Sequence, residues 1–408
     1  MSSQAQRSTG GVEMGVDEET SLILDSIDDF IEQEVAPLED DLGEKWENTR
    51  VGHAADGAPD QEILDAVDEV RRKSAEAGFY AMNMPEEYGG DDVSNVTWYR
   101  AKKHVAEQGR GLAEFMLAGP EGPKPLLLQA EGSQVEEYLE PCIAGKKSTA
   151  FGLTEPEQGS DAPSMDTSAE KDGDEWVING KKQWITNAPY CDFAQIFART
   201  SPIDEMGRYG GITCFIVEQD EFEIGSRNNA VGMEGLQAEI VLDDVRVPED
   251  RVLGDADAAF YNAMDFLSLG RLELGAQAVG LAKNLIDKCK DYANQREAFG
   301  RPIGKYQQIS TMIAKGRAKQ YAAEAAGLKL AYRMDDGQQT VEDSSIFKWF
   351  ATNTLWQIAD DAVQVHGANG LSEDNPFMDH LHIARILRVV EGTDEIQLNT
   401  VAKQNGLL

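Results

Sequence analysis

The hydrophobic pattern of the chain changes twice along its length, and this change constrains the fold more than any other feature. In the first part, apolar residues recur at helical spacing, as in Leu22, Ile23, Ile27 and Ile31. Short runs rich in β-branched and aromatic residues follow, and the last part returns to long helical patterns. We therefore predict an α+β multidomain protein with an N-terminal helical domain (17–147), a middle β-barrel or sandwich domain (148–254) and a C-terminal four-helix bundle (255–408).

The middle and C-terminal patterns are clear enough to place individual elements. Strands are predicted at 176–178, 183–186, 193–197 and 212–217. Asn179-Gly180 lies between the first two, and because this dipeptide favours a type I′ turn, it predicts a hairpin there. Helices are predicted at 258–294, 306–334, 344–365 and after Thr393. Gly300 predicts a helix end, and Thr393 predicts an N-cap with an acidic first turn behind it.

Acidic residues outnumber basic residues by 73 to 37, which gives a formal net charge of −36. The acidic residues are spread along the chain, so they belong to a whole surface rather than to a tail. Such a surface repels nucleic acid, which we exclude as a partner. We expect adaptation to a high-salt cytoplasm, because a Debye length of about 3 Å in molar salt screens repulsion between the charges. An ordinary acidic protein of a low-salt cell is the alternative.

The remaining composition excludes several other classes of protein. No apolar stretch approaches the ~18 residues of a membrane helix. The polar N-terminus does not resemble a signal or transit peptide, so we expect a cytoplasmic location. The four cysteines lie far apart, which favours buried free thiols in a reducing compartment. His380 and His382 lack the partners of a metal site, and no metal is expected.

The most site-like segment is the polar loop at 151–161, which enters the predicted β domain. The sequence contains no GxGxxG or GxxxxGK(S/T) loop, so a nucleotide would have to bind by another route. The loop has small and hydroxyl residues whose backbone N–H groups could face a phosphate or the edge of a ring. Taken alone, it is explained equally well as an ordinary polar loop.

Leu-Thr-Glu-Pro at 153–156, followed by Gly-Ser-Asp at 159–161, resembles the signature of the acyl-CoA dehydrogenase family. Other segments that resemble this family follow in its order at 179–187, 245–254, 296–307, 364–370 and 391–393. Together these segments extend over roughly residues 20–405, so the resemblance covers nearly the whole chain.

The resemblance implies one FAD per chain, bound between the β domain and the bundle, in a homotetramer built from a pair of dimers. Near the isoalloxazine ring and the substrate approach it places Phe151, Leu153, Thr154 and Ser160, with Trp184 and Thr186 on the other side of the ring. The residues implied to hold the adenosine and pyrophosphate from a second subunit are Arg296, Phe299, Gln307, Gln364, Gly367 and Ala368. Thr393 and Glu395 complete the implied cofactor contacts. Ala368 stands where many members have glycine, which would alter the close approach of backbone to cofactor.

The resemblance also implies that Glu391, which directly precedes Gly392-Thr393, is the catalytic base. A minority of members place the base before the arginine of the first bundle helix, where this chain has Gly270 before Arg271. We expect Glu273 to point to a different side of that helix. Ser160, Arg271 and Gly392 are implied as substrate contacts, with Arg271 approaching the CoA or orienting the base loop. A buried ion pair is the alternative role of Arg271.

A glutamate with an ordinary pKa of about 4.3 is a weak base. Burial in a closed pocket would raise the pKa of Glu391, whereas the dipole of the helix that begins at Thr393 would lower it. We expect burial to prevail once substrate is bound. The resemblance implies that the thioester carbonyl accepts hydrogen bonds from the Glu391 backbone N–H and from a ribityl hydroxyl of FAD.

The expected function is that of an FAD-dependent acyl-CoA dehydrogenase. Glu391 would take the α-proton of an acyl-CoA, flavin N5 would take the β-hydride, and a trans-2-enoyl-CoA would leave. An electron-transferring flavoprotein would then accept the electrons. The alternatives are an acyl-CoA oxidase that uses O2 and a non-catalytic relative that acts as an interaction protein.

Overall fold

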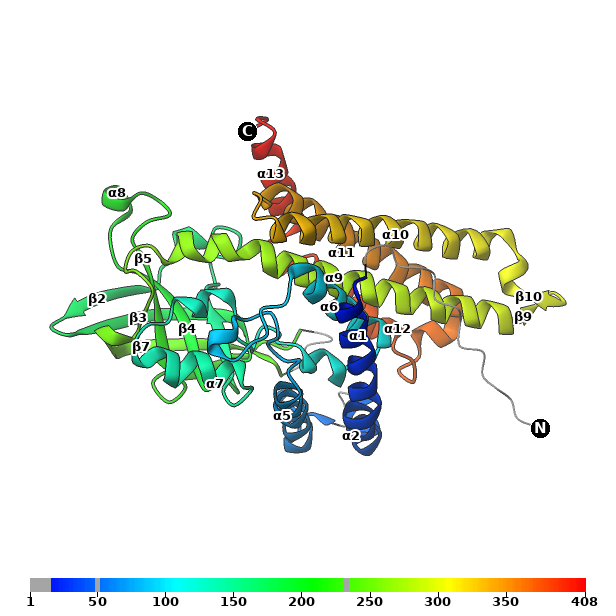
Figure 1. The fold of residues 1–408 in the computed structure, drawn as a ribbon, viewed down its shortest axis with the longest axis horizontal. Helices are drawn as coiled ribbons and strands as arrows, with labels where there is room; N and C mark the ends of the chain where they lie inside the picture. The colour runs from blue at the N-terminus through cyan, green and yellow to red at the C-terminus, as the bar shows by residue number, and fades with distance from the viewer. Residues whose placement is uncertain (1–15, 48–51, 231–234) are drawn as a thin grey trace.

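The computed structural model describes residues 16–47, 52–230 and 235–408. Figure 1 shows a sheet at one end of the molecule, long helices that extend away from it, and N-terminal helices packed where the two meet. The predicted α+β order of helical, β and helical parts is confirmed. Within the described residues, no helix combines the length and the apolar composition that crossing a membrane requires. The domain limits at 147/148 and 254/255 stay predictions.

The N-terminal part consists of helices joined by short turns. Its α-helices are α1 (Glu18–Phe30), α2 (Ala36–Leu42), α3 (Glu44–Glu47), α5 (Gln61–Glu76), α6 (Asn95–Gln108) and α7 (Glu140–Ile143). Shorter turns are η1 (Ile31–Val35), η2 (Glu86–Tyr88), η3 (Leu112–Met116), η4 (Pro125–Gln129) and η5 (Val135–Leu139). The apolar faces of α1, α5 and α6 meet in one core that includes Ile27, Val70, Trp98 and Leu112. This core seats the helical part against the long helix of the bundle, which α6 contacts.

The middle part is one eight-stranded sheet with the order β6-β7-β3-β2-β4-β5-β8, to which β1 adds by pairing with β4. Its strands are β1 (Thr149–Gly152), β2 (Ser168–Asp172), β3 (Glu175–Thr186), β4 (Phe193–Arg199), β5 (Ile212–Glu218), β6 (Glu223–Arg227), β7 (Gln237–Pro248) and β8 (Val252–Leu253). The sheet curls on itself, because β3 and β7 share one buried core with β4 and β5, as in the contact of Trp176 with Phe215.

The predicted hairpin at Asn179-Gly180 is wrong. Both residues lie inside β3, whose pairing with β7 shifts register between Ile178 and Gly180. The real turn between β2 and β3 is Gly173-Asp174, since Asp172 pairs with Glu175. The extra length at this register shift is in β7, where Asp243 and Asp244 face Asn179 alone, and the Asn179 side chain accepts a hydrogen bond from the Asp244 backbone N–H. The Asn-Gly dipeptide therefore coincides with an irregularity of the backbone, but this irregularity is a shift of strand register and not a turn.

The C-terminal bundle contains α9 (Ala259–Gln295), α10 (Gln307–Asp335), α11 (Val341–His366) and α12 (Phe377–Leu387), and α13 (Asp394–Gln404) packs on α11. The predicted helices at these positions are confirmed except for α12, which the prediction missed and which is the fourth helix of the shared core. Gly300 does not end a helix. It lies with Phe299 in the turn between β9 (Glu297–Ala298) and β10 (Arg301–Pro302), and α9 ends earlier. The predicted cap is confirmed, because the Thr393 hydroxyl accepts a hydrogen bond from the Ile396 N–H.

The four cysteines are free and buried, as the sequence predicted. Burial raises the pKa of the thiols of Cys191 and Cys289 to about 12 each, so neither is an activated nucleophile at neutral pH.

Candidate active site

Glu391 lies in the short loop between α12 and α13. The backbone of Glu391 has a φ of 54°, and Gly392 has a φ of 88°. Two buried side chains hold the carbonyl oxygens of this loop. Lys348 Nζ donates to Gly392 O at 2.7 Å, and Gln397 Nε2 donates to the oxygens of Glu391 and Gly392 at 2.9 and 3.0 Å. These bonds fix a conformation that is unfavourable for a residue with a side chain.

The Glu391 carboxylate faces α9 at Gly270. A Cβ atom added to Gly270 would lie 3.3 Å from Glu391 Oε2. Residues 391 and 270, the two positions that the family resemblance implies for a base, are therefore neighbours in space. Of the two, Glu391 carries a carboxyl group and Gly270 does not. A side chain at residue 270 would crowd the carboxylate.

Several charged groups surround Glu391. Burial raises its pKa, the charge of Glu273 adds to this effect, and the charges of Lys124, Arg271 and Lys348 oppose it. Burial thus already prevails in the chain without substrate, and its effect with substrate bound stays a prediction. By surface area Glu391 is exposed to water. The side chain therefore reaches water while its carboxylate lies against α9 and among the charged groups named above.

The prediction that Glu273 points away from this site is wrong. Glu273 follows Gly270 by three residues, which turns an α-helix by about 300° and so returns to nearly the same side. Glu273 accepts hydrogen bonds from Lys124 Nζ at 2.8 Å and from Trp98 Nε1 at 2.9 Å. Burial alone would raise the pKa of Glu273, but the nearby Lys124 and Lys102 hold it below its ordinary value.

Arg271 is buried, and its guanidinium donates to Ser345 Oγ at 3.1 Å and to Ser344 Oγ at 3.5 Å. Burial lowers the pKa of Arg271, while the charge of Glu391 favours its protonated form. Hydroxyl groups of α11 thus hold Arg271 close enough to Glu391 for their charges to interact.

A second group of predicted residues lies in the sheet, where a buried ion pair anchors the 153–161 loop. Glu155 accepts hydrogen bonds from Lys182 Nζ at 2.7 Å and from the backbone N–H groups of Asp166 and Thr167 at 2.6 and 3.0 Å. Gln183 N–H donates to Thr154 O at 2.9 Å, which ties the start of the loop to β3. Ser160, farther along the loop, is exposed.

Trp184 lies beside this anchor with a backbone φ of 60° and half of its surface exposed (50%). A sheet tryptophan is usually buried, so an exposed indole in a strained backbone suits a site that receives a flat ring. The Thr186 hydroxyl accepts from Gln237 Nε2 at 3.2 Å and keeps its own proton to donate. Phe151 and Leu153 instead pack into the protein, Phe151 against Phe197. The exposed residues fit FAD better than these two do.

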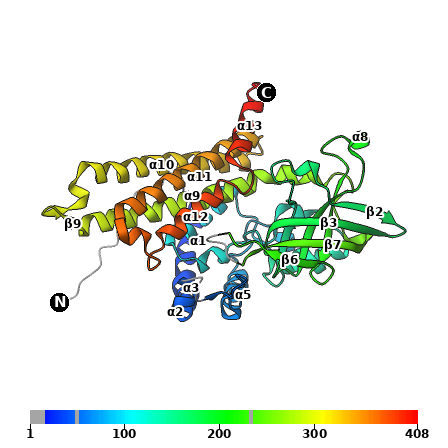
Figure 2. The same ribbon diagram turned by 180° about the vertical axis from the view of Figure 1, so that it is seen from behind.

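The third group lies at the opposite end of the bundle. Arg296, Phe299, Gln307, Gln364, Gly367 and Ala368 are all exposed there. The loop after α11 contacts the end of α9, because Tyr292 packs on His366 and its hydroxyl accepts from Asn369 Nδ2. Figures 1 and 2 place β9 and β10 far from β3. One chain therefore does not bring this group to Trp184. Thr393 and the exposed Glu395 lie beside the Glu391 loop instead.

Sequence reasoning missed Lys124, Lys348, Gln397 and Lys182 as members of the site. A single lysine or glutamine carries no local signal of a site, because such residues are usually solvated. Lys348, Gln397 and Lys182 are identified by their burial and their contacts with the site loops, and Lys124 by its contact with Glu273.

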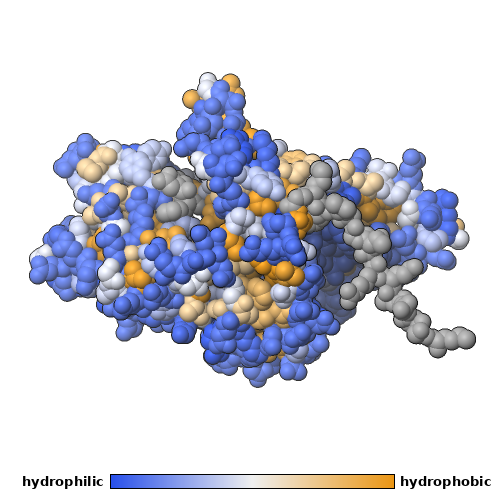
Figure 3. Space-filling view, in the orientation of Figure 1, coloured by the Kyte–Doolittle hydropathy of each residue, from blue (hydrophilic) through white to orange (hydrophobic). Residues whose placement is uncertain are grey.

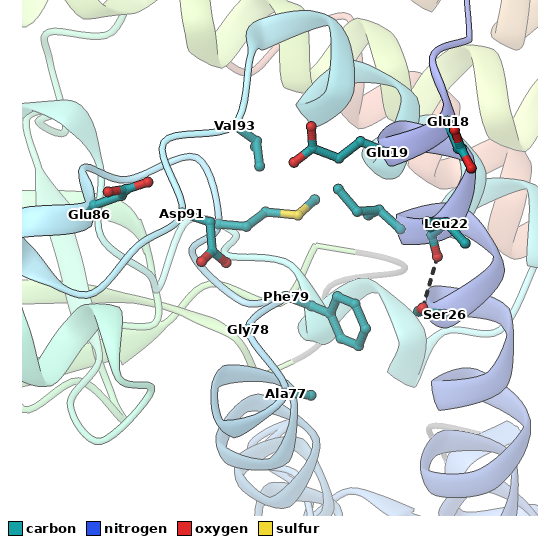
Figure 4. Close-up of a pocket in the computed structure, with 12 residues that line it drawn as sticks. Glu18, Glu19, Leu22, Ser26, Ala77, Gly78, Phe79, Glu86, Asp91 and Val93 are labelled. Atoms are coloured by element: carbon teal, nitrogen blue, oxygen red, sulfur yellow. Dashed lines mark hydrogen bonds between the residues drawn. The ribbon is translucent and has the colours of Figure 1, made fainter.

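Hydrophilic residues cover most of the face in Figure 3, with hydrophobic residues gathered toward its middle. A separate open cleft of about 780 Å³ lies between α1 and the segment that follows α5 (Figure 4). Leu22, Phe79 and Met82 provide apolar walls, and Glu18 and Glu86 are among its acidic residues. None of the predicted site residues lines this cleft.

Comparisons with known proteins agree with this architecture. The chain matches family models for the N-terminal, middle and C-terminal domains of acyl-CoA dehydrogenase at residues 17–146, 150–245 and 259–405. It is 34% identical to a 3-(aryl)acrylate reductase of Clostridium sporogenes over 390 residues, which is 94% of this chain and 98% of that relative. It is also 34% identical to the CarC subunit of a caffeyl-CoA reductase-Etf complex of Acetobacterium woodii, over 82% of this chain and 91% of that protein.

Among solved structures, butyryl-CoA dehydrogenase from Megasphaera elsdenii superposes with a TM-score of 0.83 at 30% sequence identity, over 96% of this chain and 99% of that chain. Fold, sequence and the order of the domains thus agree. The chain belongs to the acyl-CoA dehydrogenase family of FAD-dependent flavoprotein oxidoreductases.

Proposed function

We propose that this protein oxidises an acyl-CoA to a trans-2-enoyl-CoA, with Glu391 as the base. The observation that carries the proposal is the carboxylate of Glu391, which is held in a fixed loop, faces the bare surface of Gly270, and has a pKa raised by burial. A raised pKa brings the carboxylate closer in basicity to the weakly acidic α-carbon of a thioester.

FAD fits the residues that the fold exposes around Trp184. Trp184, Thr186, Thr154 and Ser160 would hold the ring system, and Leu153 and Phe151 would support them from the protein side. Bound FAD supplies the acceptor for the hydride that leaves the β-carbon. The Lys182–Glu155 pair keeps the loop in place, because it ties the loop to β3 through a buried contact.

Side chains and backbone groups of this chain hold the substrate in position and accept its α-proton. Glu391 takes the α-proton on its carboxylate, and Lys348 and Gln397 hold the loop while charge moves. The backbone N–H of Glu391 is proposed to donate to the thioester carbonyl, which would stabilise negative charge on that oxygen. Arg271 favours the ionised form of Glu391 before the reaction. Gly392 and Ser160 are proposed substrate contacts.

We further propose a homotetramer in which each cofactor site is completed by another subunit. The exposed group formed by Arg296, Phe299, Gln307 and the loop after α11 lies at the far end of the molecule from Trp184 (Figures 1 and 2). Phe299 is 97% exposed, which is unusual for a phenylalanine and supports a contact with another chain. A monomeric protein in solution would contradict this proposal.

An electron-transferring flavoprotein is the proposed electron acceptor. The Acetobacterium woodii relative is named as a subunit of a complex with Etf, which supports this choice over oxygen. We also propose a cytoplasmic location, supported by the free buried thiols, and adaptation to high salt, supported by the net charge of −36.

Reduction of an enoyl-CoA is a second candidate, because two relatives carry reductase names. The same groups serve both directions, since a base that removes the α-proton in one direction returns it in the other. The redox partner would then decide the physiological direction.

Anaerobic titration of the purified yellow protein with a panel of acyl-CoAs tests the proposal, with loss of flavin absorbance as the signal. We expect Glu391→Gln to retain FAD and to lose the bleaching, whereas Glu205→Gln, at an exposed site of α8 (Ile203–Met206), should behave as the wild type. If no thioester bleaches the wild-type flavin, or if Glu391→Gln bleaches at the normal rate, the proposal is wrong.

A further inference from the structure

One side of α9 carries polar residues in line with the point where Glu391 meets the helix. Gly270, Glu273 and Gln277 are three and seven residues apart, so they lie within about 60° of one another around the helix. All three are partly accessible to water, whereas their neighbours Leu272 and Ala276 are buried. The accessible side of α9 thus includes Gly270, beside which the Glu391 carboxylate lies.

The N-terminal part adds charged groups to the same line. Lys124 Nζ contacts Glu273 at 2.8 Å, and Gln277 Nε2 donates to Glu114 Oε2 at 3.2 Å. Lys102 Nζ donates to the carbonyl oxygens of Leu117 and Ala118 at 3.1 and 2.8 Å. We refer to Glu273, Gln277, Lys124, Lys102 and Glu114 as the polar strip.

Burying the charged groups of the polar strip costs free energy. Burial raises the pKa of Glu114 to about 7 and lowers the pKa of Lys102. A plain alkyl chain would gain most from apolar walls, since burying polar groups against it leaves their hydrogen bonds unmade. The polar strip, which is in line with Glu391 along α9, therefore favours an acyl group that can form hydrogen bonds with it.

The spacing of the strip sets where such a group should lie. With a rise of 1.5 Å per residue, Glu273 and Gln277 lie about 4.5 and 10 Å beyond Gly270 along α9. Lys124 contacts Glu273, so its ammonium group lies about as far along α9 as Glu273 does. The rise of about 4.5 Å from Gly270 to Glu273 corresponds to roughly four bonds of an extended acyl chain, counted from a carbon held at Glu391.

Lys124 also has hydrogen-bonding capacity to spare. An ammonium group has three donors, and within the described part of the chain Lys124 uses one of them, toward Glu273. The side chain of Lys124 is 24% exposed, so its free donors can reach a ligand.

We infer that the polar strip selects acyl-CoA substrates whose acyl group carries an oxygen acceptor, a hydroxyl or a carboxylate, near its fifth carbon, with Lys124 as the donor. This inference rests on the function proposed above, since it assumes that the α-carbon lies at Glu391. It assigns Lys124 a role in specificity that neither composition nor local sequence pattern indicates.

Steady-state kinetics of the holoenzyme with matched substrates test the inference. Pentanoyl-CoA is compared with 5-hydroxypentanoyl-CoA and with glutaryl-CoA, which separate a neutral acceptor from a carboxylate. We expect kcat/KM to be at least about tenfold higher for one or both oxygen-bearing substrates, because a site built to hydrogen-bond a group rejects the analogue that lacks it.

Lys124→Met should bring this ratio close to one while flavin absorbance stays unchanged. Since that change leaves Glu273 without its partner, Lys124→Met with Glu273→Gln is measured as well, because the introduced glutamine would still accept from Trp98 and no charge would be left unpaired. Lys290→Met, at an exposed site of α9, is the matched control and should keep the wild-type ratio.

The outcomes separate this inference from the proposed function. If pentanoyl-CoA bleaches the flavin and is used as well as or better than both oxygen-bearing substrates, the inference is wrong and the proposed function stands. If the preference exists but survives both Lys124 variants, Lys124 is not its cause and the inference is also wrong. If no thioester bleaches the flavin, the proposed function fails first.

Discussion

Replacing Lys182 with methionine should destabilise the sheet more than any exposed charge substitution. Lys182 has no exposed side-chain surface, and its partner Glu155 has 3%. Burial alone would raise the pKa of Glu155, but the attraction of Lys182 and the donated hydrogen bonds outweigh it and lower this pKa. Methionine fills similar volume and removes the charge, so the Glu155 carboxylate would remain buried without its cationic partner, held by the backbone N–H groups of Asp166 and Thr167.

Removing one partner of a buried pair typically costs about 3–5 kcal/mol of unfolding free energy, because the other charge stays buried and uncompensated. Chemical unfolding of the holoprotein, followed by circular dichroism and by flavin fluorescence, measures this loss. Lys171→Met is the matched control, since Lys171 and Glu249 form an ion pair at 2.5 Å with 45% and 58% of their side-chain surfaces exposed. Exposed pairs of this kind contribute roughly 0–1 kcal/mol.

The pH dependence gives a second readout. Because the pKa of Glu155 is below its ordinary value in the folded protein, its contribution to stability is present above that ordinary value and is lost as the pH falls through the folded pKa. Without Lys182, burial would dominate, so acid unfolding should begin at a higher pH. If Lys182→Met loses no more stability than Lys171→Met, or if acid unfolding does not move, the reasoning from burial is refuted.

Three further predictions concern the base and the solvent. The rate of flavin reduction should fall as the pH drops through the pKa of Glu391; Glu273→Gln removes a negative charge and should move this fall to lower pH, and an unmoved profile would contradict the role of Glu273. Lys348→Met removes the donor to Gly392 O and should slow flavin reduction by about tenfold or more with FAD still bound; normal kcat with normal KM would show that the loop does not need this bond. Unfolding midpoints should rise between dilute buffer and molar KCl because salt screens the charge of −36, and a fall would refute the high-salt proposal.

Local sequence was sufficient for the long helices and for the central strands. α9, α10 and α11 were predicted within a few residues, because their apolar spacing extends over many turns. The Thr393 cap was equally clear, since a hydroxyl before two acidic residues satisfies free N–H groups locally. The family resemblance pointed to Glu391, and the structure places its carboxylate beside Gly270.

Local sequence failed where distant contacts decide the conformation. α12 has only 11 residues and owes its position to the shared core of the bundle. Asn179-Gly180 has the preference of a turn, yet pairing with β7 keeps it within β3, opposite a bulge of β7. The contact of Glu273 with Lys124 joins two distant segments, so it could not be read from either segment alone.

The sequence by itself determined the order of helical and β parts, the acidic surface and the presence of a carboxylate before Gly392-Thr393, because these depend on composition and on neighbours along the chain. Only the tertiary structure decided what surrounds that carboxylate. Burial raises the pKa of Glu391, and the charges of Lys348, Lys124 and Arg271, which come from separate segments, oppose this rise. Charges interact through space, so the pKa of a group depends on which residues folding brings near it.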